Sequence, residues 1–384
     1  MKRKAVVIDT YSRGSYHEVI NQSYLMMISE LYEDVIYIAD KSSCDNMRRL
    51  LGRCGVVCDN VIFQEKRFRN INLKLPGLNY LAKIVIVSFL NYWYYVKASK
   101  DSDIFYNNNL FFATLFIHFF ARKTKNIYDL CHNDMELINP SKANSATTKM
   151  LSKYFCFVFN KIVLDKIFHF ILLSPKMVDY FNHFISSKNI RCIFSIDHSY
   201  IRPLIKDREN FAIVDSRIKI GIPGAISPER GLDTLKRILN SLTNDNVCIY
   251  ALSSCTEQLD NVHFVMLNNN NELLPFEQYN SYVQSMDAML LLYDKNSYKL
   301  TASGAVLEAI WNEKPIIAMH NMYFDYLFQK FGKLGVLCNN VNELVENIKK
   351  FDSVEDCVNT CKLAKRQLTP GVVKYQLKRI IDNV

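Results

Sequence analysis

Short apolar runs of strand length alternate with longer helix-like segments along the whole chain. This alternation is typical of parallel sheets wound with helices, and it excludes all-helical and all-β folds. A polar stretch, residues 201–210, divides it into two series. The first series of expected strands is 4–9, 35–38, 61–63, 103–106, 126–130, 168–173 and 192–196. The second is 218–222, 247–251, 264–267, 288–292, 315–319 and 336–338. We therefore expect an α/β fold with two doubly wound domains facing a cleft.

The expected helices of the second half are 229–242, 276–285, 304–311 and 341–350. The first of these carries one apolar stripe, formed by Leu232, Leu235, Leu239 and Leu242. A basic amphipathic helix, 372–381, closes the chain. We predict an N-terminal domain over 1–200, a C-terminal domain over 201–366 and a last segment, 367–384, that packs back on the first domain.

Composition narrows the class of protein. Hydrophobic residues make up 49% and charged residues 22% of the 384, which is typical of a globular protein with real cores. The 11 cysteines are scattered and form no CxxC pair, so neither a disulfide framework nor a zinc ribbon is indicated. The first residues are basic, but Asp9 ends the apolar run that follows, and no signal peptide is expected. We expect a cytoplasmic protein.

The positive charge lies in the first half of the chain. Residues 51–100 carry 8 basic and 2 acidic residues, and an aromatic, apolar segment, 80–96, follows the basic cluster. Basic residues beside apolar bulk suit an anionic membrane surface. We expect membrane contacts at Lys66, Arg67, Arg69 and Trp93 on the inner face of the membrane. The alternative is an ordinary buried helix behind a solvated basic loop.

Two turns follow buried strands of the second half and open helices. The first, 224–231, contains Gly224 and Arg230, and its free N–H groups and guanidinium suit a phosphate. Such a segment is also read as a plain turn, with Ser227 as the cap and Pro228 at the first helical position.

The second turn places Ser303 and Gly304 at the head of a helix, which is a second anion-binding position. Glu308 lies further along that helix, placed to accept hydrogen bonds from a sugar or ribose diol. Taken singly, Ser303 is read as a helix cap and Glu308 as a solvated helix residue.

Both segments resemble the donor half of GT-B glycosyltransferases of the family 4 type. The resemblance covers residues 217–350 and rests on the turn after Gly224, on 285–288, and on the SG…EA…KPIIA pattern of 303–318. It implies two Rossmann-like domains, with Arg230 as the cation for the nucleotide diphosphate, Ser303 and Gly304 as phosphate donors, and Glu308 as the ribose-binding carboxylate. It also implies that no metal is needed.

The sequence departs from this family at three positions. Ala225 replaces a basic residue, Glu313 replaces a glycine, and Leu300 stands where the first glutamate of a Glu-x7-Glu pair is expected. The missing glutamate leaves the contacts to the donor sugar, and the retention or inversion of configuration, open.

The first domain is expected to supply acceptor contacts and any base. The loop after the first strand contains Gly14, which allows close approach to the donor. His17, Asp129, His132 and Glu136 are the catalytic candidates, because each is expected near the carboxyl end of a strand. A loop histidine is also commonly a surface or packing residue.

The resulting hypothesis is transfer of a sugar from a nucleotide-diphosphate sugar to a hydroxyl of a saccharide acceptor, lipid-linked by implication of the resemblance, in polysaccharide or glycan biosynthesis. Two other hypotheses stay open: a sugar-nucleotide epimerase on the same fold, and a membrane-docked scaffold that binds a nucleotide without turnover. A nucleic-acid partner is not expected, since no binding motif accompanies the basic residues.

Overall fold

The structure is a computed structural model that describes residues 4–14, 17–68, 76–107, 110–131, 134–139, 144–203, 213–243, 246–268, 274–293, 299–351 and 355–384. The chain forms two compact units. The first comprises Met1–Pro203, Lys299–Ala302 and Leu368–Val384, and the second comprises Leu204–Tyr298 and Ser303–Gln367. The chain therefore returns to the first unit at its end. The expected polar linker lies almost wholly outside the described residues.

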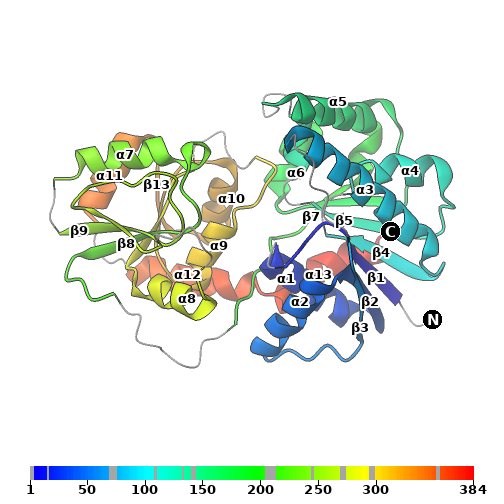
Figure 1. Ribbon diagram of the computed structural model, residues 1–384, viewed down its shortest axis with the longest axis horizontal. Helices are drawn as coiled ribbons and strands as arrows, with labels where there is room; N and C mark the ends of the chain where they lie inside the picture. The colour runs from blue at the N-terminus through cyan, green and yellow to red at the C-terminus, as the bar shows by residue number, and fades with distance from the viewer. Residues whose placement is uncertain are drawn as a thin grey trace. The chain divides into compact units, whose positions relative to one another are not determined.

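The first unit is built on a parallel sheet of seven strands in the order β3-β2-β1-β4-β5-β6-β7 (Figure 1). Its strands are β1 (Lys4–Asp9), β2 (Asp34–Asp40), β3 (Val61–Lys66), β4 (Ser102–Tyr106), β5 (Ile127–Leu130), β6 (Phe168–Leu172) and β7 (Ile193–Ser195). The central strands β1 and β4 to β6 are almost continuously buried, as parallel strands covered on both faces are.

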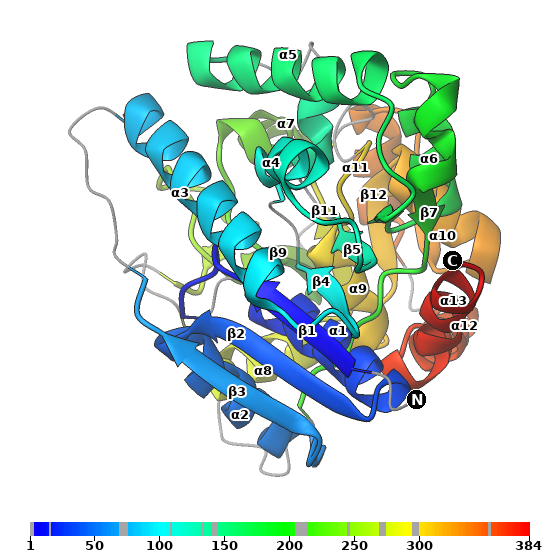
Figure 2. The same cartoon turned by 90° about the vertical axis from the view of Figure 1, so that its right-hand side faces the viewer.

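Helices cover both faces of this sheet. They are α1 (Glu18–Leu31), α2 (Lys41–Arg53), α3 (Pro76–Lys97), α4 (Ala113–Phe120), α5 (Ala146–Lys161), α6 (Pro175–Asn182) and α13 (Pro370–Asp382). Figure 2 shows α3 and α4 above the strands and α2 below them. Helix α3 packs against α4 and α5, while α1 packs against α2 and α13. The structure thus separates an α3–α4–α5 layer from an α1–α2–α13 layer.

The last helix, α13, is tied to the first unit by specific contacts. Lys374 forms an ion pair with Glu30 of α1, and the Tyr200 N–H donates to the Leu368 carbonyl at 2.9 Å. Gln376 accepts a hydrogen bond from the Asp197 N–H at 2.7 Å. The C-terminal segment is therefore a structural part of the first unit.

The second unit contains a parallel sheet of six strands in the order β10-β9-β8-β11-β12-β13. They are β8 (Ile218–Ile222), β9 (Val247–Ala251), β10 (Phe264–Met266), β11 (Ala288–Leu291), β12 (Ile316–Met319) and β13 (Gly335–Cys338). The helices are α7 (Leu232–Ser241), α8 (Phe276–Ser285), α9 (Gly304–Trp311), α10 (Met322–Phe331), α11 (Val341–Lys349) and α12 (Glu355–Gln367).

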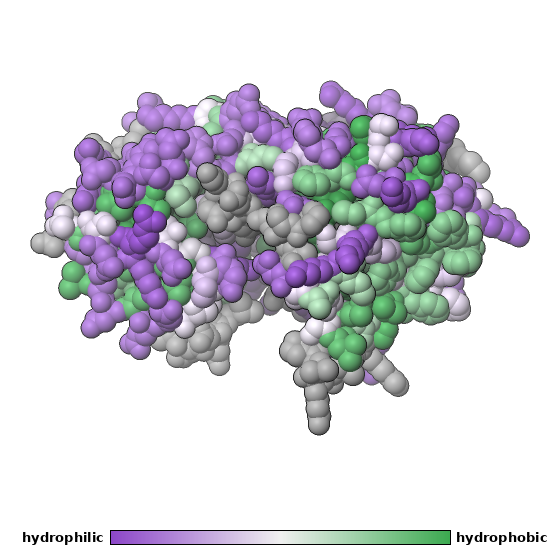
Figure 3. Space-filling model, turned by 90° about the horizontal axis from the view of Figure 1, so that it is seen from above, coloured by the Kyte–Doolittle hydropathy of each residue, from purple (hydrophilic) through white to green (hydrophobic). Residues whose placement is uncertain are grey.

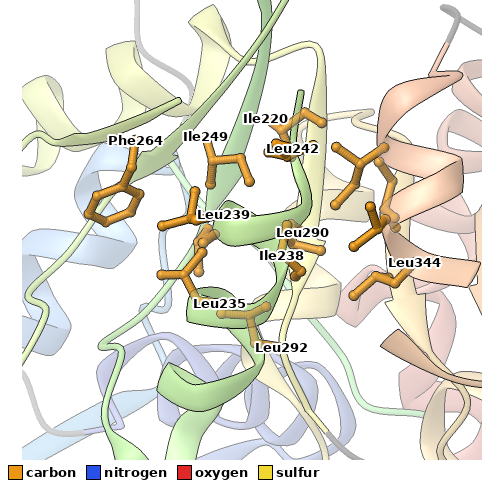
Figure 4. Packing of buried hydrophobic residues seen from close by; sticks show 14 of the residues in the cluster. Ile220, Leu235, Ile238, Leu239, Leu242, Ile249, Phe264, Leu290, Leu292 and Leu344 are labelled. Carbon is orange, nitrogen blue, oxygen red and sulfur yellow. The ribbon is translucent and has the colours of Figure 1, made fainter. Parts of the chain in front are cut away.

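Helix α7 shows how the sequence pattern becomes packing. Its predicted leucine stripe is buried, and Leu235 and Leu239 lie beside Ile249 and Phe264 of neighbouring strands (Figure 4). On the opposite side of this cluster stands Leu344 of α11. The apolar stripe, spaced three and four residues apart, fixes which face of α7 meets the sheet.

The strands and helices that the sequence analysis expects by residue range all occur in the structure, with ends shifted by a few residues. Helices α10 and α12 were not expected. In the alternative reading of this segment Ser227 is the cap, and it does occupy the N-cap position, but its hydroxyl makes no capping bond and donates to the Glu229 carboxylate at 2.9 Å. Pro228 does occupy the first position of a short 3-10 helix, Pro228–Arg230. The α/β fold of two doubly wound domains is confirmed.

Candidate functional site

Each sheet has one switch point, where the strand order reverses direction and where ligands bind in doubly wound folds. In the second unit β8 lies between β9 and β11, so the connections after β8 and β11 leave in opposite directions. In doubly wound sheets ligands bind at such a switch point, outside the carboxyl ends of the strands. The loop after β8 and the loop after β11 are the two segments predicted to bind phosphate.

A glycine brings these two loops into contact. Gly231, which ends the first loop, has a φ of 83°, and a Cβ added there would lie 2.4 Å from the Leu292 Cβ and 2.5 Å from the Leu292 carbonyl oxygen. Leu292 directly follows β11. Gly224, at the start of the loop, also has a positive φ of 82°, but a Cβ there would meet nothing within 4 Å. Arg230 precedes Gly231 and its side chain is exposed.

Ser303 is the N-cap of α9 and has an unusual environment. Its side chain is 1% exposed. Its Oγ makes neither a capping bond nor any other hydrogen bond with the described residues. A buried hydroxyl without a partner is costly, so such a group in a native fold calls for an explanation. Gly304, the first helical residue, is exposed and leaves the backbone N–H groups open. An anion at this helix terminus accounts for both features.

Glu308 lies one turn into α9, and its carboxylate is already engaged. It is 6% exposed and accepts a hydrogen bond from the Tyr279 hydroxyl at 2.8 Å. The reading of Glu308 as a solvated helix residue is therefore wrong. Tyr279 comes from α8, so this bond ties α8 to the helix that begins at Ser303.

The first unit has a corresponding switch point between β1 and β4. The loop after β1 is organised by Asp9, whose carboxylate accepts hydrogen bonds from the Ser12 N–H at 2.9 Å and the Asn21 amide at 2.8 Å. Burial raises the pKa of Asp9. Gly14 in this loop has a φ of 56°, and its N–H donates to the Ser42 hydroxyl at 3.0 Å.

His17 precedes α1 with a left-handed backbone, φ 57°. Burial lowers its pKa to about 4, and the neighbouring imidazole of His198 contributes to the shift. Burial lowers the pKa of His198 to about 4 as well. Both imidazoles are therefore neutral at neutral pH.

The other three catalytic candidates differ in their surroundings. Asp129 lies near the carboxyl end of β5, as expected, and is buried. His132 lies outside the described residues. Glu136, in the 3-10 helix Asp134–Ile138, accepts a hydrogen bond from the Leu300 N–H at 2.7 Å through Oε1. Its Oε2 is buried and has no hydrogen-bond partner among the described residues.

The sequence-based candidates omit one polar residue of this unit. Asn107 directly follows β4, is 2% exposed, and neither atom of its amide has a hydrogen-bond partner among the described residues. It lies beside the switch point, on the strand next to β1. A polar residue immediately after the expected strand 103–106 was the available signal.

The expected membrane residues lie on two elements. Lys66 ends β3 and Arg67 follows it, whereas Arg69 lies outside the described residues. Trp93 is partly exposed on α3, and the Lys97 ammonium lies 4.4 Å from its ring centroid. Within the described part of the chain, none of the helices combines the length and the hydropathy that crossing a bilayer requires.

Helix α3 is neither wholly buried nor wholly exposed. One face, including Ile84 and Tyr95, is in the core, and the other exposes Val85, Ile86, Phe89, Trp93 and Val96. Phe119 and Phe120 at the end of α4 and Phe157 of α5 are exposed as well. We call these eight residues the apolar face. Figure 3 shows hydrophobic residues gathered on this side of the first unit.

Comparison with known proteins places the fold. No protein-family model matches the sequence, and a search of curated proteins finds no significant relative. Solved structures match over nearly the whole chain. TarM has a TM-score of 0.60 at 13% identity, covering 100% of this chain and 98% of that one. WaaG, a glycosyltransferase involved in lipopolysaccharide biosynthesis, has a TM-score of 0.54 at 12% identity and 98% coverage of both chains.

UGT89C1 of Arabidopsis thaliana, in a structure complexed with UDP, has a TM-score of 0.55 at 11% identity, with 100% of this chain and 99% of that chain covered. Identities this low show the fold alone. The chain has the GT-B fold, an α/β architecture of two doubly wound domains.

Proposed function

We propose that this protein is a glycosyltransferase that moves a sugar from a nucleotide-diphosphate sugar to a hydroxyl of a saccharide acceptor. The observation that carries the proposal is Ser303, a buried hydroxyl at the head of α9 that has no hydrogen-bond partner among the described residues. The contact between Gly231 and Leu292 supports it, because it holds the other phosphate-binding loop at the same switch point. The GT-B neighbours include a structure complexed with UDP.

Each residue of the donor site is assigned to one part of the nucleotide. The N–H groups that follow Ser303, together with its Oγ, bind a phosphate at the head of α9. Arg230 neutralises the diphosphate, since a guanidinium offers paired donors to phosphate oxygens. Glu308, held by Tyr279 one turn into α9, is the carboxylate that accepts the ribose hydroxyls. Gly224 and Gly304 let the backbone approach the phosphates.

Two substitutions test this assignment. Nucleotide binding is measured by isothermal titration with UDP and GDP, and turnover is measured alongside it. Arg230→Ala removes a charge-stabilising group and is expected to lower turnover by about 100-fold or more. Arg237→Ala removes an equally exposed arginine from α7 and serves as the matched control. Equal nucleotide binding and turnover in the two variants would contradict the donor site.

Ser303→Ala gives an independent measurement. A hydrogen bond to a charged group contributes about 1.5–3 kcal/mol, so the affinity for the nucleotide diphosphate should fall about tenfold or more. The stability of the free protein should not fall, because the hydroxyl makes no hydrogen bond with the part of the chain that the structure describes. A stability loss with unchanged affinity would indicate that Ser303 has a purely structural role.

The chemical step requires a base that takes the proton of the acceptor hydroxyl as its oxygen bonds to the anomeric carbon and the nucleotide diphosphate departs. His17 is neutral at neutral pH, and Glu136 has a buried oxygen that no described residue hydrogen-bonds. Asp129 and His132 remain candidates for the same role. We propose that transfer needs no metal, and turnover that persists in EDTA is the expected result.

The epimerase and scaffold hypotheses differ from this proposal in what happens to the nucleotide sugar with and without an acceptor. An epimerase releases altered nucleotide sugar in the absence of acceptor, and a transferase does not. A scaffold that binds the nucleotide also shows a rise in melting temperature with nucleotide diphosphates, but it consumes no nucleotide sugar when an acceptor is supplied. A melting-temperature panel of UDP, GDP, CDP and CMP tests the nucleotide binding that all three hypotheses share.

We also propose that the apolar face docks on an anionic membrane and that the acceptor is lipid-linked. Phe89 is 57% and Phe120 74% exposed, so two large aromatic rings of the apolar face are mostly in contact with solvent. Helices α3, α4 and α5 contain no aspartate or glutamate, while lysines occur along α3 and α5. Apolar side chains flanked by cations suit the boundary between headgroups and acyl chains.

Vesicle sedimentation tests the membrane proposal. Phe89→Ser together with Phe120→Ser should abolish most binding to vesicles containing phosphatidylglycerol, since each ring adds about 1–3 kcal/mol when buried. Tyr375→Ser changes an exposed aromatic residue on α13 and is the control. Substituting the basic residues 66, 67 and 69 together should weaken binding mostly at low salt. Unaltered sedimentation of the double variant would refute the apolar face as the contact.

A further inference from the structure

Two cations of the first unit face the loop after β1 from different elements. Arg13 belongs to the loop itself, and Lys83 belongs to α3. The Lys83 ammonium lies 3.7 Å from the ring centroid of Tyr11, the second residue after β1. The Arg13 guanidinium lies 5.0 Å from the ring centroid of Phe68, which follows β3. Both charges are thus held over aromatic rings at the carboxyl edge of the sheet.

The Arg13 guanidinium is held in place by hydrogen bonds, but not all of its N–H donors have a partner among the described residues. Its Nη1 donates to the carbonyl oxygens of Thr10 at 3.1 Å and Ser12 at 2.7 Å. Its Nε is buried and donates no hydrogen bond within the described residues. The Asp40 Oδ2 lies 3.9 Å from this Nε, which is an ion pair but too long for a hydrogen bond.

The nearby carboxylates of Asp40 and Asp9 also accept hydrogen bonds from other groups. Asp40 accepts hydrogen bonds from the Ser42 hydroxyl at 2.6 Å and from the Phe68 N–H at 3.2 Å. Asp9 is buried and accepts from the β1 loop and from Asn21. Lys83 itself makes no ion pair with a described carboxylate and is half-buried.

The two cations also act on each other. Burial is the larger cause that lowers the pKa of Lys83, and the positive charge of Arg13 is the next. The Asp9 carboxylate offsets part of this repulsion, and an anion bound by both cations would stabilise their charged forms further. Directly after β4, the strand beside β1, Asn107 has a buried amide whose donor and acceptor have no partner among the described residues.

We propose that Arg13 and Lys83 form an anion subsite at the switch point of the first unit, which binds a phosphate or diphosphate group of the acceptor. This inference rests on the proposed function, in which the first unit binds the acceptor. It narrows the acceptor to a phosphate-bearing saccharide. Guanidinium and ammonium groups with free donors are the usual protein ligands of such groups.

The position of Lys83 on α3 connects the subsite with the apolar face. Lys83 lies about a third of a turn around the helix from Phe89. One side of α3 thus carries the apolar face and an adjoining side carries the cation. A diphosphate that links a saccharide to a lipid has the same arrangement, with its apolar chain next to its charge. A soluble phosphorylated acceptor shares the anion but not the chain.

The test measures binding of inorganic pyrophosphate by titration calorimetry, with every variant made in the Arg230→Ala background so that the proposed donor site contributes little. Lys83→Gln should lower the affinity for pyrophosphate about tenfold. Lys97→Gln, which removes an ammonium held over a ring on the same helix, should leave it unchanged. Lys83→Arg keeps the charge and should retain most of the binding, which separates loss of the cation from misfolding.

The outcomes are distinguishable from failure of the proposed function. Equal affinity in the Lys83→Gln and Lys97→Gln variants would overturn the subsite. Loss of pyrophosphate binding in Lys83→Gln, combined with no UDP binding by the wild type, would refute the donor site and keep the anion subsite. A second titration uses farnesyl diphosphate. If it binds more tightly than pyrophosphate and its binding depends on Lys83, the subsite binds the anion of a lipid-linked acceptor. If the two affinities are equal, the subsite binds the anion of a soluble acceptor.

Discussion

Replacing Gly231 with alanine tests the close approach of the two phosphate-binding loops. The added methyl group would meet the Leu292 side chain at 2.4 Å and its carbonyl oxygen at 2.5 Å. The carbonyl oxygen belongs to the backbone directly after β11 and has little freedom to move. The loop must therefore shift away from the strand end, which separates Arg230 from the segment that leads to Ser303.

The magnitude follows from a matched pair of glycines. Gly224 and Gly231 have φ angles of 82° and 83°, so alanine costs about 1–2 kcal/mol of backbone strain at either position. Only at Gly231 does overpacking add about 1–3 kcal/mol. The difference between the two variants, about 1–3 kcal/mol, is the part due to the contact with Leu292.

The chain offers a convenient probe for this measurement. It has 2 tryptophans, Trp93 in the first unit and Trp311 in the second. In a Trp93→Phe background, urea unfolding followed by fluorescence reports the second unit through Trp311. UDP affinity should fall about tenfold in Gly231→Ala and by less in Gly224→Ala. Equal destabilisation by the two alanines would show that Gly231 does not touch Leu292.

Three further predictions concern stability. The pKa of His198 is about 4 in the folded protein and 6.5 in a free chain, so the unfolded chain binds more protons between these values. Folding should therefore weaken as the pH falls from 6.5 to 4, and His198→Gln should reduce that slope by up to about 1.4 kcal/mol per pH unit in urea titrations. Leu377→Ala on α13 should destabilise the first unit by about 2–5 kcal/mol, against under about 1 kcal/mol for the exposed Val372→Ala. Tyr279→Phe should cost the second unit about 1.5–3 kcal/mol, measured by the same fluorescence assay, because Glu308 loses a donor.

The strands were predictable because parallel strands buried on both faces are continuous apolar runs, and β1, β8 and β9 have the expected bounds. Helix α12 escaped prediction since its buried positions are Cys357, Cys361 and Ala364, which give no strong apolar stripe. Those two cysteines do prove to be buried and free.

The candidate site was predictable only in part. The position of Ser303 at a helix start follows from local sequence, but the burial of its hydroxyl depends on how the loop packs. The contacts of Gly231 with Leu292 and of Lys83 with Tyr11 join residues far apart in the chain, so no local pattern contains them. Asp129 lies near the carboxyl end of its strand, as expected, but its burial depends on the elements that cover β5 and not on local sequence.

The return of the chain to the first unit has a consequence for biosynthesis. Helix α13 covers α1, yet all of Leu204 to Tyr298 and Ser303 to Gln367 is translated between Pro203 and Leu368. At about 5–20 residues per second this delay is on the order of ten to thirty seconds. During that time the nascent first unit presents the uncovered side of α1 to solvent and to chaperones. Its folding is thus completed by a helix that is translated only after the second unit has been made.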